Sequence, residues 1–290
     1  MIRGTLPALV TPFRDGAVDE EALRGLVERC IEGGVDGLVP CGTTGESVTL
    51  SAAEAREVVR ICVAQSNGRV PVIAGVGTVS TAHTIELAEA AKEAGADGLL
   101  VVCPYYNRPT QAGLAAHFRA VAAAVPMPTV LYNIPGRTGV DLSVDTLASL
   151  SDVSALVAIK EATGNVARAQ RILAGCGDRF AVLSGDDSLT LPFLAVGGTG
   201  VISVTANVFP KPTSDVVRLF EAGELAAARA LHLRLLPVHD AMFVESNPGP
   251  AKALLAAQGH MSDAVRLPLV VPTDASRQTV LAAVKAAGLA

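Results

Sequence analysis

The sequence predicts an α/β protein in which eight strands alternate with helices and close into a (β/α)8 barrel with a C-terminal helical appendage. Two observations support this prediction. Short apolar runs of strand length recur along the chain, and each is followed by a stretch in which apolar residues have helical spacing. The chain has 290 residues, of which 50% are apolar and 18% charged, so it can bury the large core that a barrel needs.

The strands are predicted as apolar runs that end in small or polar residues. They lie at residues 6–10, 36–40, 70–76, 97–103, 128–133, 153–160, 180–185 and 200–204. The intervening helices are predicted at residues 22–31, 51–66, 80–94, 111–124, 143–150, 165–174, 187–196 and 213–222.

Local signals mark some of these boundaries. Gly33 and Gly34 end the first helix, and Ser51 with Glu54 three residues later forms a capping box at the start of the second. The segments GGVDGL (33–38) and AGADGL (94–99) are similar in sequence, and each leads into a predicted strand. Such an internal sequence similarity is consistent with repeated strand–helix units.

An open doubly wound sheet is the alternative architecture. Such a fold usually carries GxGxxG after its first strand, and GVGTVS at residues 75–80 lacks the third glycine. A phosphate-binding barrel is a further alternative. GGTG at residues 197–200, however, precedes the eighth strand instead of following it.

The character of the chain changes after the last barrel helix. Residues 224–290 are rich in Ala and Leu and have helical spacing, with one proline-bounded link before the final helix. We therefore predict a catalytic barrel over residues 1–223 and a C-terminal helical domain over residues 224–290.

Composition argues against several classes of protein. The formal net charge is −5 and no run of Lys or Arg occurs, which argues against nucleic-acid binding. No apolar run reaches the ~18 residues of a membrane span, and the first residues lack a signal-peptide pattern. Five cysteines without a CxxC pair indicate reduced thiols and a cytoplasmic location, and five dispersed histidines argue against a metal site.

In a (β/α)8 barrel, chemistry takes place at the carboxyl ends of the strands. The most reactive side chains of this chain follow several of these ends: Thr43, Thr44, Tyr105, Tyr106, Tyr132, Arg137, Lys160 and Asp186. The barrel therefore predicts that they share one rim.

Lys160 is the central candidate. It alternates with Leu156 and Ala158 on one face of its strand, and Glu161 points to the other face. If the first face lines the barrel, burial lowers the pKa of the lysine and favours a neutral amine that can form a Schiff base with a carbonyl carbon. The alternative is a lysine at a strand end that extends to solvent.

The other rim residues also have two interpretations. Tyr132 ends the preceding strand, where it could exchange protons with a bound carbonyl oxygen or simply be a core tyrosine. CGTTGE could hold a small carboxylate or be an ordinary glycine turn. Arg137 could bind a carboxylate or be a surface charge. Asp186 and Asp187 are interpreted as a helix N-cap.

Six motifs in order resemble one known family. GTTGE, PYYNRP, YNIPGRTG, IKEATGN, LSGDD and GVISVTAN resemble the dihydrodipicolinate synthase family, in the N-acetylneuraminate lyase superfamily of Schiff-base barrels, from about residue 4 to the C-terminus. The resemblance implies a lyase that condenses pyruvate with L-aspartate 4-semialdehyde in lysine and diaminopimelate biosynthesis. It also implies a homotetramer built from two tight dimers, with no metal or organic cofactor.

The resemblance assigns roles residue by residue. Lys160 matches the imine-forming lysine and Tyr132 the general acid/base, while Thr44 and Tyr106 match the rest of a hydroxyl relay. Thr43 and Thr44 match the pyruvate carboxylate site, Arg137 the residue that binds the semialdehyde carboxylate, and Gly185 and Ile202 positions that line the lysine. Tyr105 matches a tyrosine that reaches across a dimer interface.

One departure concerns feedback by lysine, which binds many family members at the tight-dimer interface. Ser47 and Tyr105 are kept, but other positions differ from the lysine-sensitive pattern: Ala52 and Ala55 replace histidines, Val79 an asparagine and His83 a glutamate. The resemblance therefore predicts weak or absent feedback.

Two rival functions remain at this point. Another Schiff-base enzyme of the superfamily, such as N-acetylneuraminate lyase or a 2-keto-3-deoxy-sugar-acid aldolase, would use Lys160 identically. A non-catalytic 2-oxo-acid-binding paralogue would be expected to lack Lys160, Tyr132 or the threonine pair, and all are present.

Overall fold

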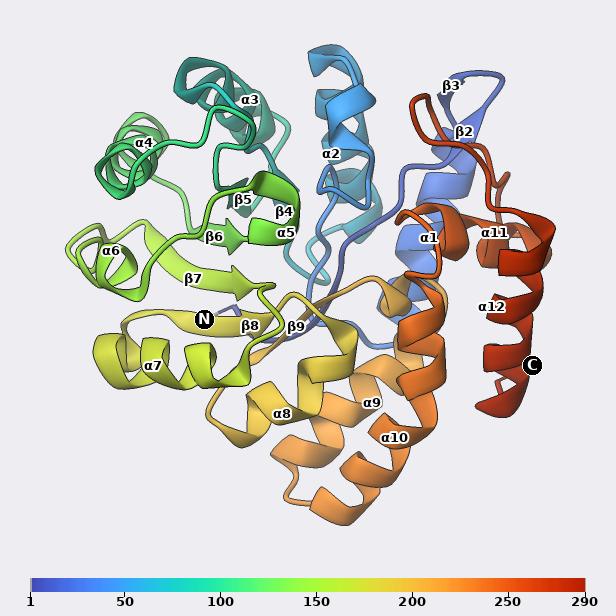
Figure 1. The fold of residues 1–290 in the computed structure, drawn as a ribbon. Coiled ribbons are helices and arrows are strands. Elements are labelled where there is room, and N and C mark those ends of the chain that lie inside the picture. Colours follow the sequence, from blue (N-terminus) through green and yellow to red (C-terminus); the bar gives the residue numbers. More distant parts are fainter. Residues whose placement is uncertain (1, 290) are drawn as a thin grey trace.

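A computed structural model describes residues 2–289 and shows a curled parallel sheet surrounded by helices (Figure 1). The strands are β1 (Gly4–Pro7), β2 (Phe13–Arg14), β3 (Ala17–Val18), β4 (Ile73–Gly75), β5 (Gly98–Val102), β6 (Thr129–Asn133), β7 (Leu156–Glu161), β8 (Ala181–Ser184) and β9 (Gly200–Ser203). The helices are α1 (Glu20–Glu32), α2 (Ala52–Ser66), α3 (Thr81–Glu93), α4 (Gln111–Ala124), α5 (Pro135–Thr138), α6 (Val144–Ala148), α7 (Val166–Cys176), α8 (Thr190–Ala195), α9 (Pro210–Glu221), α10 (Leu225–Ala241), α11 (Gly249–Ala257) and α12 (Asp274–Ala286).

Seven strands form one sheet in the order β1-β9-β8-β7-β6-β5-β4, and β2 and β3 form a separate hairpin. The sheet closes through the segment predicted as the second strand. This segment makes only isolated parallel bridges, from Val39 to Ala8 on one side and from Leu38 to Val72 on the other. The predicted barrel is thus confirmed, with one strand shortened to single bridges.

The short second strand has a local cause. Pro40 has no N–H to donate to a ladder, and Cys41 adopts a left-handed backbone with φ of 57°. The chain therefore leaves the extended conformation directly after Val39, and the loop that carries Thr43 and Thr44 begins there.

The helix signals in the sequence agree with the structure. α1 ends at the C-cap Gly33, and α2 begins with a complete capping box between Ser51 and Glu54. Asp36 and Asp97, the aspartates of the two similar segments GGVDGL and AGADGL, have matching roles. Asp36 accepts a hydrogen bond from the Thr5 N–H and Asp97 one from the Val72 N–H, each at 2.8 Å. Each carboxylate thus ties one strand–helix unit to a neighbour.

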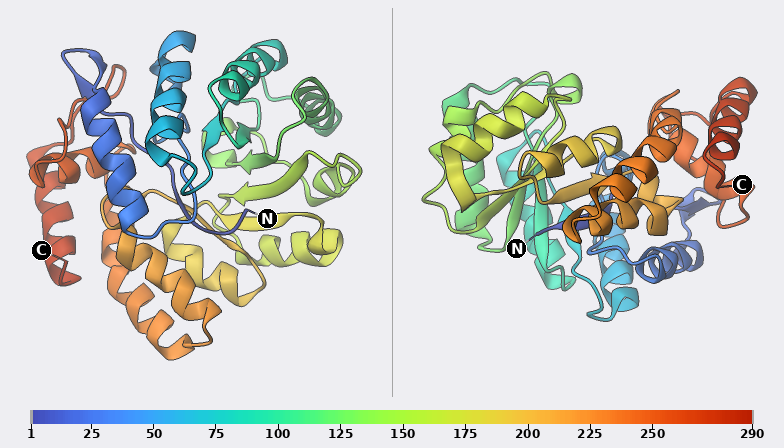
Figure 2. Two further views of the ribbon diagram at one scale, coloured as in Figure 1. Left: turned by 180° about the vertical axis from the view of Figure 1, so that it is seen from behind. Right: turned by 90° about the horizontal axis from the view of Figure 1, so that it is seen from below.

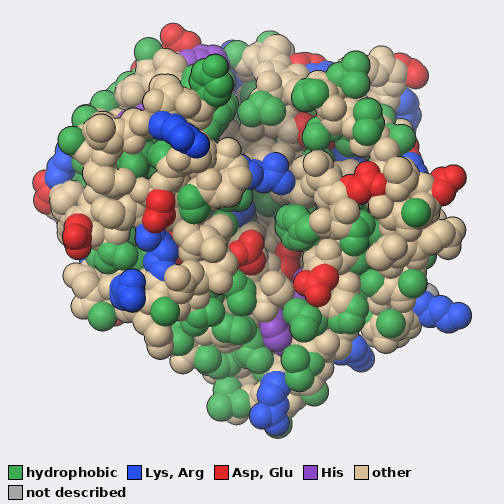
Figure 3. Space-filling model, viewed as in Figure 1, with side chains coloured by type: hydrophobic (Ala, Val, Ile, Leu, Met, Phe, Trp, Pro, Cys, Tyr) green, Lys and Arg blue, Asp and Glu red, His purple; other side chains and the backbone are tan. Residues whose placement is uncertain are grey.

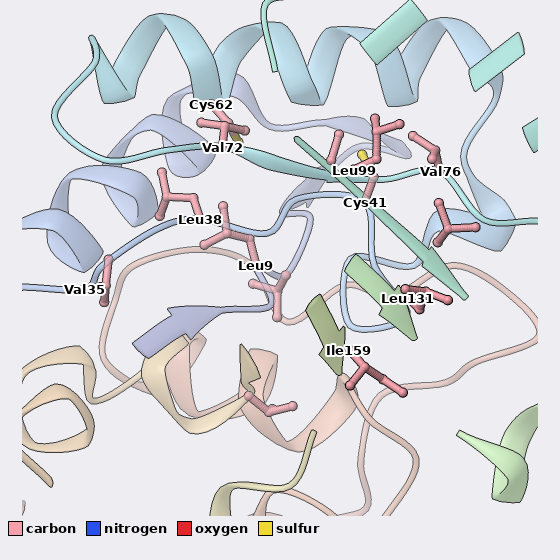
Figure 4. Close-up of a cluster of buried hydrophobic side chains, with 14 of the residues drawn as sticks. Leu9, Val35, Leu38, Cys41, Cys62, Val72, Val76, Leu99, Leu131 and Ile159 are labelled. Carbon is pink, nitrogen blue, oxygen red and sulfur yellow. The ribbon is translucent and has the colours of Figure 1, made fainter. Parts of the chain in front are cut away.

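Two apolar clusters fill the molecule. The larger one lies between the sheet and the helices, and Figure 4 shows part of it, where Leu38, Val72 and Leu99 pack together. The smaller one fills the barrel interior and consists of Leu6, Ala8, Val39, Ile73, Leu100, Val130, Tyr132, Ala158, Ala181, Leu183 and Ile202. This inner cluster places Tyr132 and the face of Ala158 inside the barrel.

The C-terminal helices pack on one side of the barrel. Figure 2 shows α11 and α12 beside α1 and α10, away from α4 and α6. None of the helices in the described part of the chain is long and apolar enough to cross a membrane. All five cysteines carry free thiols, and all but Cys176 are buried.

Candidate active site

Lys160 and Tyr132 lie side by side at the mouth of the barrel. They are register partners on the parallel strands β7 and β6, so their side chains leave the sheet on the same face. The Lys160 Nζ atom lies 4.3 Å from the centroid of the Tyr132 ring, and each residue is only 5% exposed. The amine therefore points into the barrel beside the phenol instead of extending into solvent.

The surroundings of Lys160 favour its neutral form. Burial lowers the pKa of the amine from 10.5 to about 8, although the carboxylates of Asp186 and Asp187 act in the opposite direction. The Arg137 guanidinium adds to the lowering. A useful fraction of the amine is therefore unprotonated near neutral pH, and this form can attack a carbonyl carbon.

Tyr132 is held in its protonated form. Burial raises the pKa of its phenol to about 12, while the Arg137 charge and the nearby Thr43 hydroxyl lower it in part. Thr43 and Tyr132 also line the same small cavity, of about 20 Å³. The phenol is therefore available as a proton donor, and Thr43 is the hydroxyl that faces it.

Thr44 points elsewhere. Its side chain is 3% exposed, and its Oγ1 atom accepts a hydrogen bond of 2.9 Å from Asn247 Nδ2, which comes from the C-terminal region. The resemblance had assigned the relay hydroxyl to Thr44. In the structure Thr43 lines the small cavity together with Tyr132, and the Thr44 hydroxyl lies beside Asn247.

Arg137 lies on α5, the short helix that follows β6. Its side chain is exposed, and no hydrogen bond or ion pair of its guanidinium is found within residues 2–289. The positive charge of Arg137 nevertheless lowers the pKa of both Lys160 and Tyr132. A free arginine beside the mouth can bind a carboxylate bidentately. Figure 3 shows this face of the molecule hollowed near its centre, with charged side chains around the hollow.

The outer face of the same strands carries a buried polar network. Glu161, which is 0% exposed, accepts a hydrogen bond of 2.8 Å from Arg168 Nε and one of 3.3 Å from Asn133 Nδ2. Asn133 also donates to Asp141 and accepts from the Leu142 N–H. This network fixes the loop after β6, which carries Arg137.

The two positions expected to line the lysine lie close to it in the fold. Gly185 follows β8, and its N–H donates to the Glu161 carbonyl at 2.8 Å. A Cβ atom at Gly185 would lie 2.5 Å from the Cβ of Ala162, so a larger residue would displace the end of β7. Ile202 lies on β9 and is fully buried in the inner cluster.

Asp186 and Asp187 do not cap a helix with their side chains, so that prediction was wrong. The Asp187 carboxylate accepts from the Ser203 hydroxyl and from the N–H groups of Val204 and Thr205. It thereby joins β8 to the end of β9. The charge of Asp186 raises the pKa of Lys160, which opposes the effect of burial.

The two adjacent tyrosines differ in environment. Tyr105 is half-buried, and Tyr106 is 92% exposed with a left-handed backbone, φ of 66°. A bulky residue rarely adopts this backbone conformation, and it persists only where the surrounding structure imposes it. Within one chain, the structure does not bring Tyr106 to Tyr132.

Two residues that contact the loop of Thr43 and Thr44 had no assigned role in the sequence. Asn247 contacts Thr44, and the buried Lys252 donates to Glu46 Oε1 at 2.6 Å, two residues beyond Thr44. Lys252 and Asn247 lie in the region predicted as a helical appendage. The one available signal was a lysine and an asparagine in the proline-flanked segment SNPGPAK.

A second cavity, of about 210 Å³, lies between α2 and α3. Its lining includes the positions that the resemblance connects with lysine feedback: Ser47, Ala52, Ala55, Val79, His83 and Tyr105. No acidic side chain is among the residues that line it. An ammonium group would find no carboxylate there, and weak feedback by lysine stays a prediction.

Comparisons with known proteins agree with this geometry. The model of the dihydrodipicolinate synthetase family matches residues 1–287. The 4-hydroxy-tetrahydrodipicolinate synthase of Geobacter sp. (strain M21) is 55% identical over 98% of each chain, and that of Sorangium cellulosum is 58% identical over 98% of this chain and 95% of its own.

A solved structure shows the same likeness in three dimensions. The chloride-inhibited dihydrodipicolinate synthase from Acinetobacter baumannii, complexed with pyruvate, has a TM-score of 0.97 and 43% identity, with 100% of both chains covered. The barrel, the lysine–tyrosine pair and the whole-chain matches lead to one conclusion: this chain belongs to the dihydrodipicolinate synthetase family.

Proposed function

We propose that the chain condenses pyruvate with L-aspartate 4-semialdehyde, as a 4-hydroxy-tetrahydrodipicolinate synthase, through an imine on Lys160. The observation that carries this proposal is the buried Lys160 amine, 4.3 Å from the Tyr132 ring centroid and with a pKa of about 8. The names of the relatives and the pyruvate complex of the A. baumannii enzyme support the substrate assignment.

The chemistry follows from the two side chains. The neutral Nζ attacks the keto carbon of pyruvate, and Tyr132 gives a proton to the departing oxygen, which leaves as water. The resulting imine withdraws electrons and acidifies the neighbouring methyl group. Loss of a proton there gives an enamine, whose carbon attacks the aldehyde carbon of the second substrate. The amine of the semialdehyde then attacks the imine carbon, which closes the six-membered ring and releases the Lys160 amine.

We assign the relay hydroxyl next to Tyr132 to Thr43, because Thr43 lines the same small cavity as Tyr132 and lowers the pKa of its phenol. Thr44 then serves only in the site for the pyruvate carboxylate. Since Tyr106 is 92% exposed in one chain, its proposed part in the relay requires the site of a neighbouring copy. If Tyr105 lies at the same interface, as the resemblance implies, this supports the association of two copies, the tight dimer of the proposed homotetramer. A cytoplasmic location remains part of the proposal and rests on the unpaired cysteines.

Borohydride reduction in the presence of pyruvate tests the nucleophile. We expect a pyruvate-derived adduct on the peptide that contains Lys160, detected by mass mapping, and faster trapping as the pH rises through about 8, the pKa of the amine. A coupled assay with aspartate semialdehyde and the next reductase then tests the second substrate. Adduct formation at another lysine would reject the proposed site.

Arg137→Ala is expected to raise the KM for aspartate semialdehyde by about 10–100-fold, because a charge-assisted hydrogen bond to its carboxylate is lost. The KM for pyruvate should change much less. Because Arg137 lowers the pKa of Lys160, the acid limb of the pH–rate profile should also move to higher pH.

The matched control is Arg119→Ala, an arginine on the outer helix α4 that pairs with Asp152. Steady-state kinetics with each substrate varied separately distinguishes the two variants. An unchanged semialdehyde KM in the Arg137 variant would favour a partner that offers hydroxyl groups, as a sugar-acid enzyme would require.

A further inference from the structure

The C-terminal region reaches into the substrate site through one buried hydrogen bond. Asn247 Nδ2 donates to Thr44 Oγ1 at 2.9 Å, and the two residues are 5% and 3% exposed. They lie 203 positions apart in the sequence. The contact therefore joins the loop after the second barrel segment to the residue just before α11.

The other polar atom of the same amide is unused. Asn247 Oδ1 is buried and has no hydrogen-bond partner in the described part of the chain. An unpaired buried carbonyl oxygen is costly, and an asparagine with a purely structural role usually has both polar atoms bonded. The side chain is thus oriented for the single bond that it makes to Thr44.

A second buried contact holds this arrangement rigid. Lys252, on α11, donates to Glu46 Oε1 at 2.6 Å and to the Ala264 carbonyl at 2.6 Å, and its Nζ lies 4.3 Å from the Phe13 ring centroid. Glu46 itself has a left-handed backbone, φ of 55°. The loop that carries Thr44 is therefore joined at two points to the segment that contains Asn247 and α11.

The direction of the hydrogen bond decides what Thr44 can do. An amide N–H can only donate, and a threonine hydroxyl has one hydrogen and can accept as well. When Thr44 Oγ1 accepts from Asn247, its own hydrogen is free to be donated elsewhere. We propose that Asn247 is a positioning residue that makes the Thr44 hydroxyl a donor to the carboxylate of the bound 2-oxo acid. This inference rests on the proposed role of Thr44 in the carboxylate site.

Asn247→Asp tests the direction of the bond, because the carboxylate has the same shape and can only accept. Thr44 would then donate to residue 247 and turn away from the substrate. We expect the KM for pyruvate to rise at least about tenfold, with kcat within about threefold of wild type. Borohydride trapping at saturating pyruvate should still modify Lys160. Asn247→Ala should raise the same KM, and it provides the test if the Asp variant fails to fold.

Ser246→Asp is the matched control, since it places the same charge on the exposed neighbouring residue and should leave the pyruvate KM close to wild type. Thr44→Val and the double variant Thr44→Val/Asn247→Asp complete the set. If Asn247 acts through Thr44, the double variant should have nearly the same KM as Thr44→Val alone.

Three results would overturn the inference. A wild-type pyruvate KM in Asn247→Asp would mean that Thr44 donates to Asn247, the reverse direction. Additive effects in the double variant would mean that the two side chains act separately. A lowered kcat with unchanged KM would indicate a structural role. If Thr44→Val itself has a wild-type KM, the failure belongs to the proposed carboxylate site, whatever Asn247 does.

Discussion

Lys160→Ala is expected to lower kcat/KM for the condensation by more than about 10⁴-fold, the scale seen when an enzyme loses its nucleophile. No other lysine can replace it. Three of the remaining four, Lys92, Lys211 and Lys285, lie on outer helices, and Lys252 is committed to the buried pair with Glu46. Trapping with borohydride should also disappear, which makes mass mapping the direct measurement.

The same substitution should not weaken the fold. Burial lowers the pKa of Lys160 from 10.5 to about 8, so at pH 7 folding must bury an amine that is mostly charged. Removing that amine relieves the cost, and we expect an unfolding temperature equal to or above that of wild type. Lys92→Ala on α3 is the control for general effects. Residual activity above about one hundredth of wild type would point to a different nucleophile.

Lys252→Met is expected to lower the free energy of unfolding by about 3–5 kcal/mol, because it leaves the Glu46 carboxylate buried without its partner. Both residues are nearly inaccessible, at 0% and 2% exposed, and Glu46 also accepts a hydrogen bond from the Arg266 N–H. The loop that carries Thr43 and Thr44 would also lose its contact with Lys252, so the KM for pyruvate should rise as well. Urea unfolding followed by fluorescence or circular dichroism measures the first effect.

Two comparisons make this result specific. The double variant Glu46→Gln/Lys252→Met removes the unpaired charge and should recover part of the lost stability. Lys211→Met breaks an exposed pair with Asp215 on α9 and should cost no more than about 0.5 kcal/mol. A loss from Lys252→Met as small as that from Lys211→Met would show that water reaches Glu46.

The barrel and its central pair were predictable because they depend on local rules. Apolar runs and helical spacing indicated the alternating elements, and the alternation of side chains along a strand placed Lys160 on the face of Ala158. The position of Tyr132 at the end of the preceding strand then made the two residues neighbours. These rules hold whatever the rest of the chain does.

The features that escaped prediction depend on loops and long-range contacts. Thr43 and Thr44 are adjacent in a loop, where no periodicity tells which hydroxyl faces Tyr132. Asp187 was expected to cap a helix, but it bonds to groups at the end of β9 instead. Asn247 and Lys252 contact residues more than 200 positions away, and composition alone described their region as Ala- and Leu-rich helix.

The pairing of Lys160 and Glu161 on opposite faces of β7 has a consequence for any redesign of this barrel. Because side chains alternate along the strand, Lys160 and the adjacent Glu161 lie on opposite faces of the sheet. On the outer face, Arg168 forms an ion pair with Glu161. Deleting a single residue within β7 would exchange the two, put the carboxylate in the lumen and expel the amine. The strand therefore tolerates substitutions far better than changes of length.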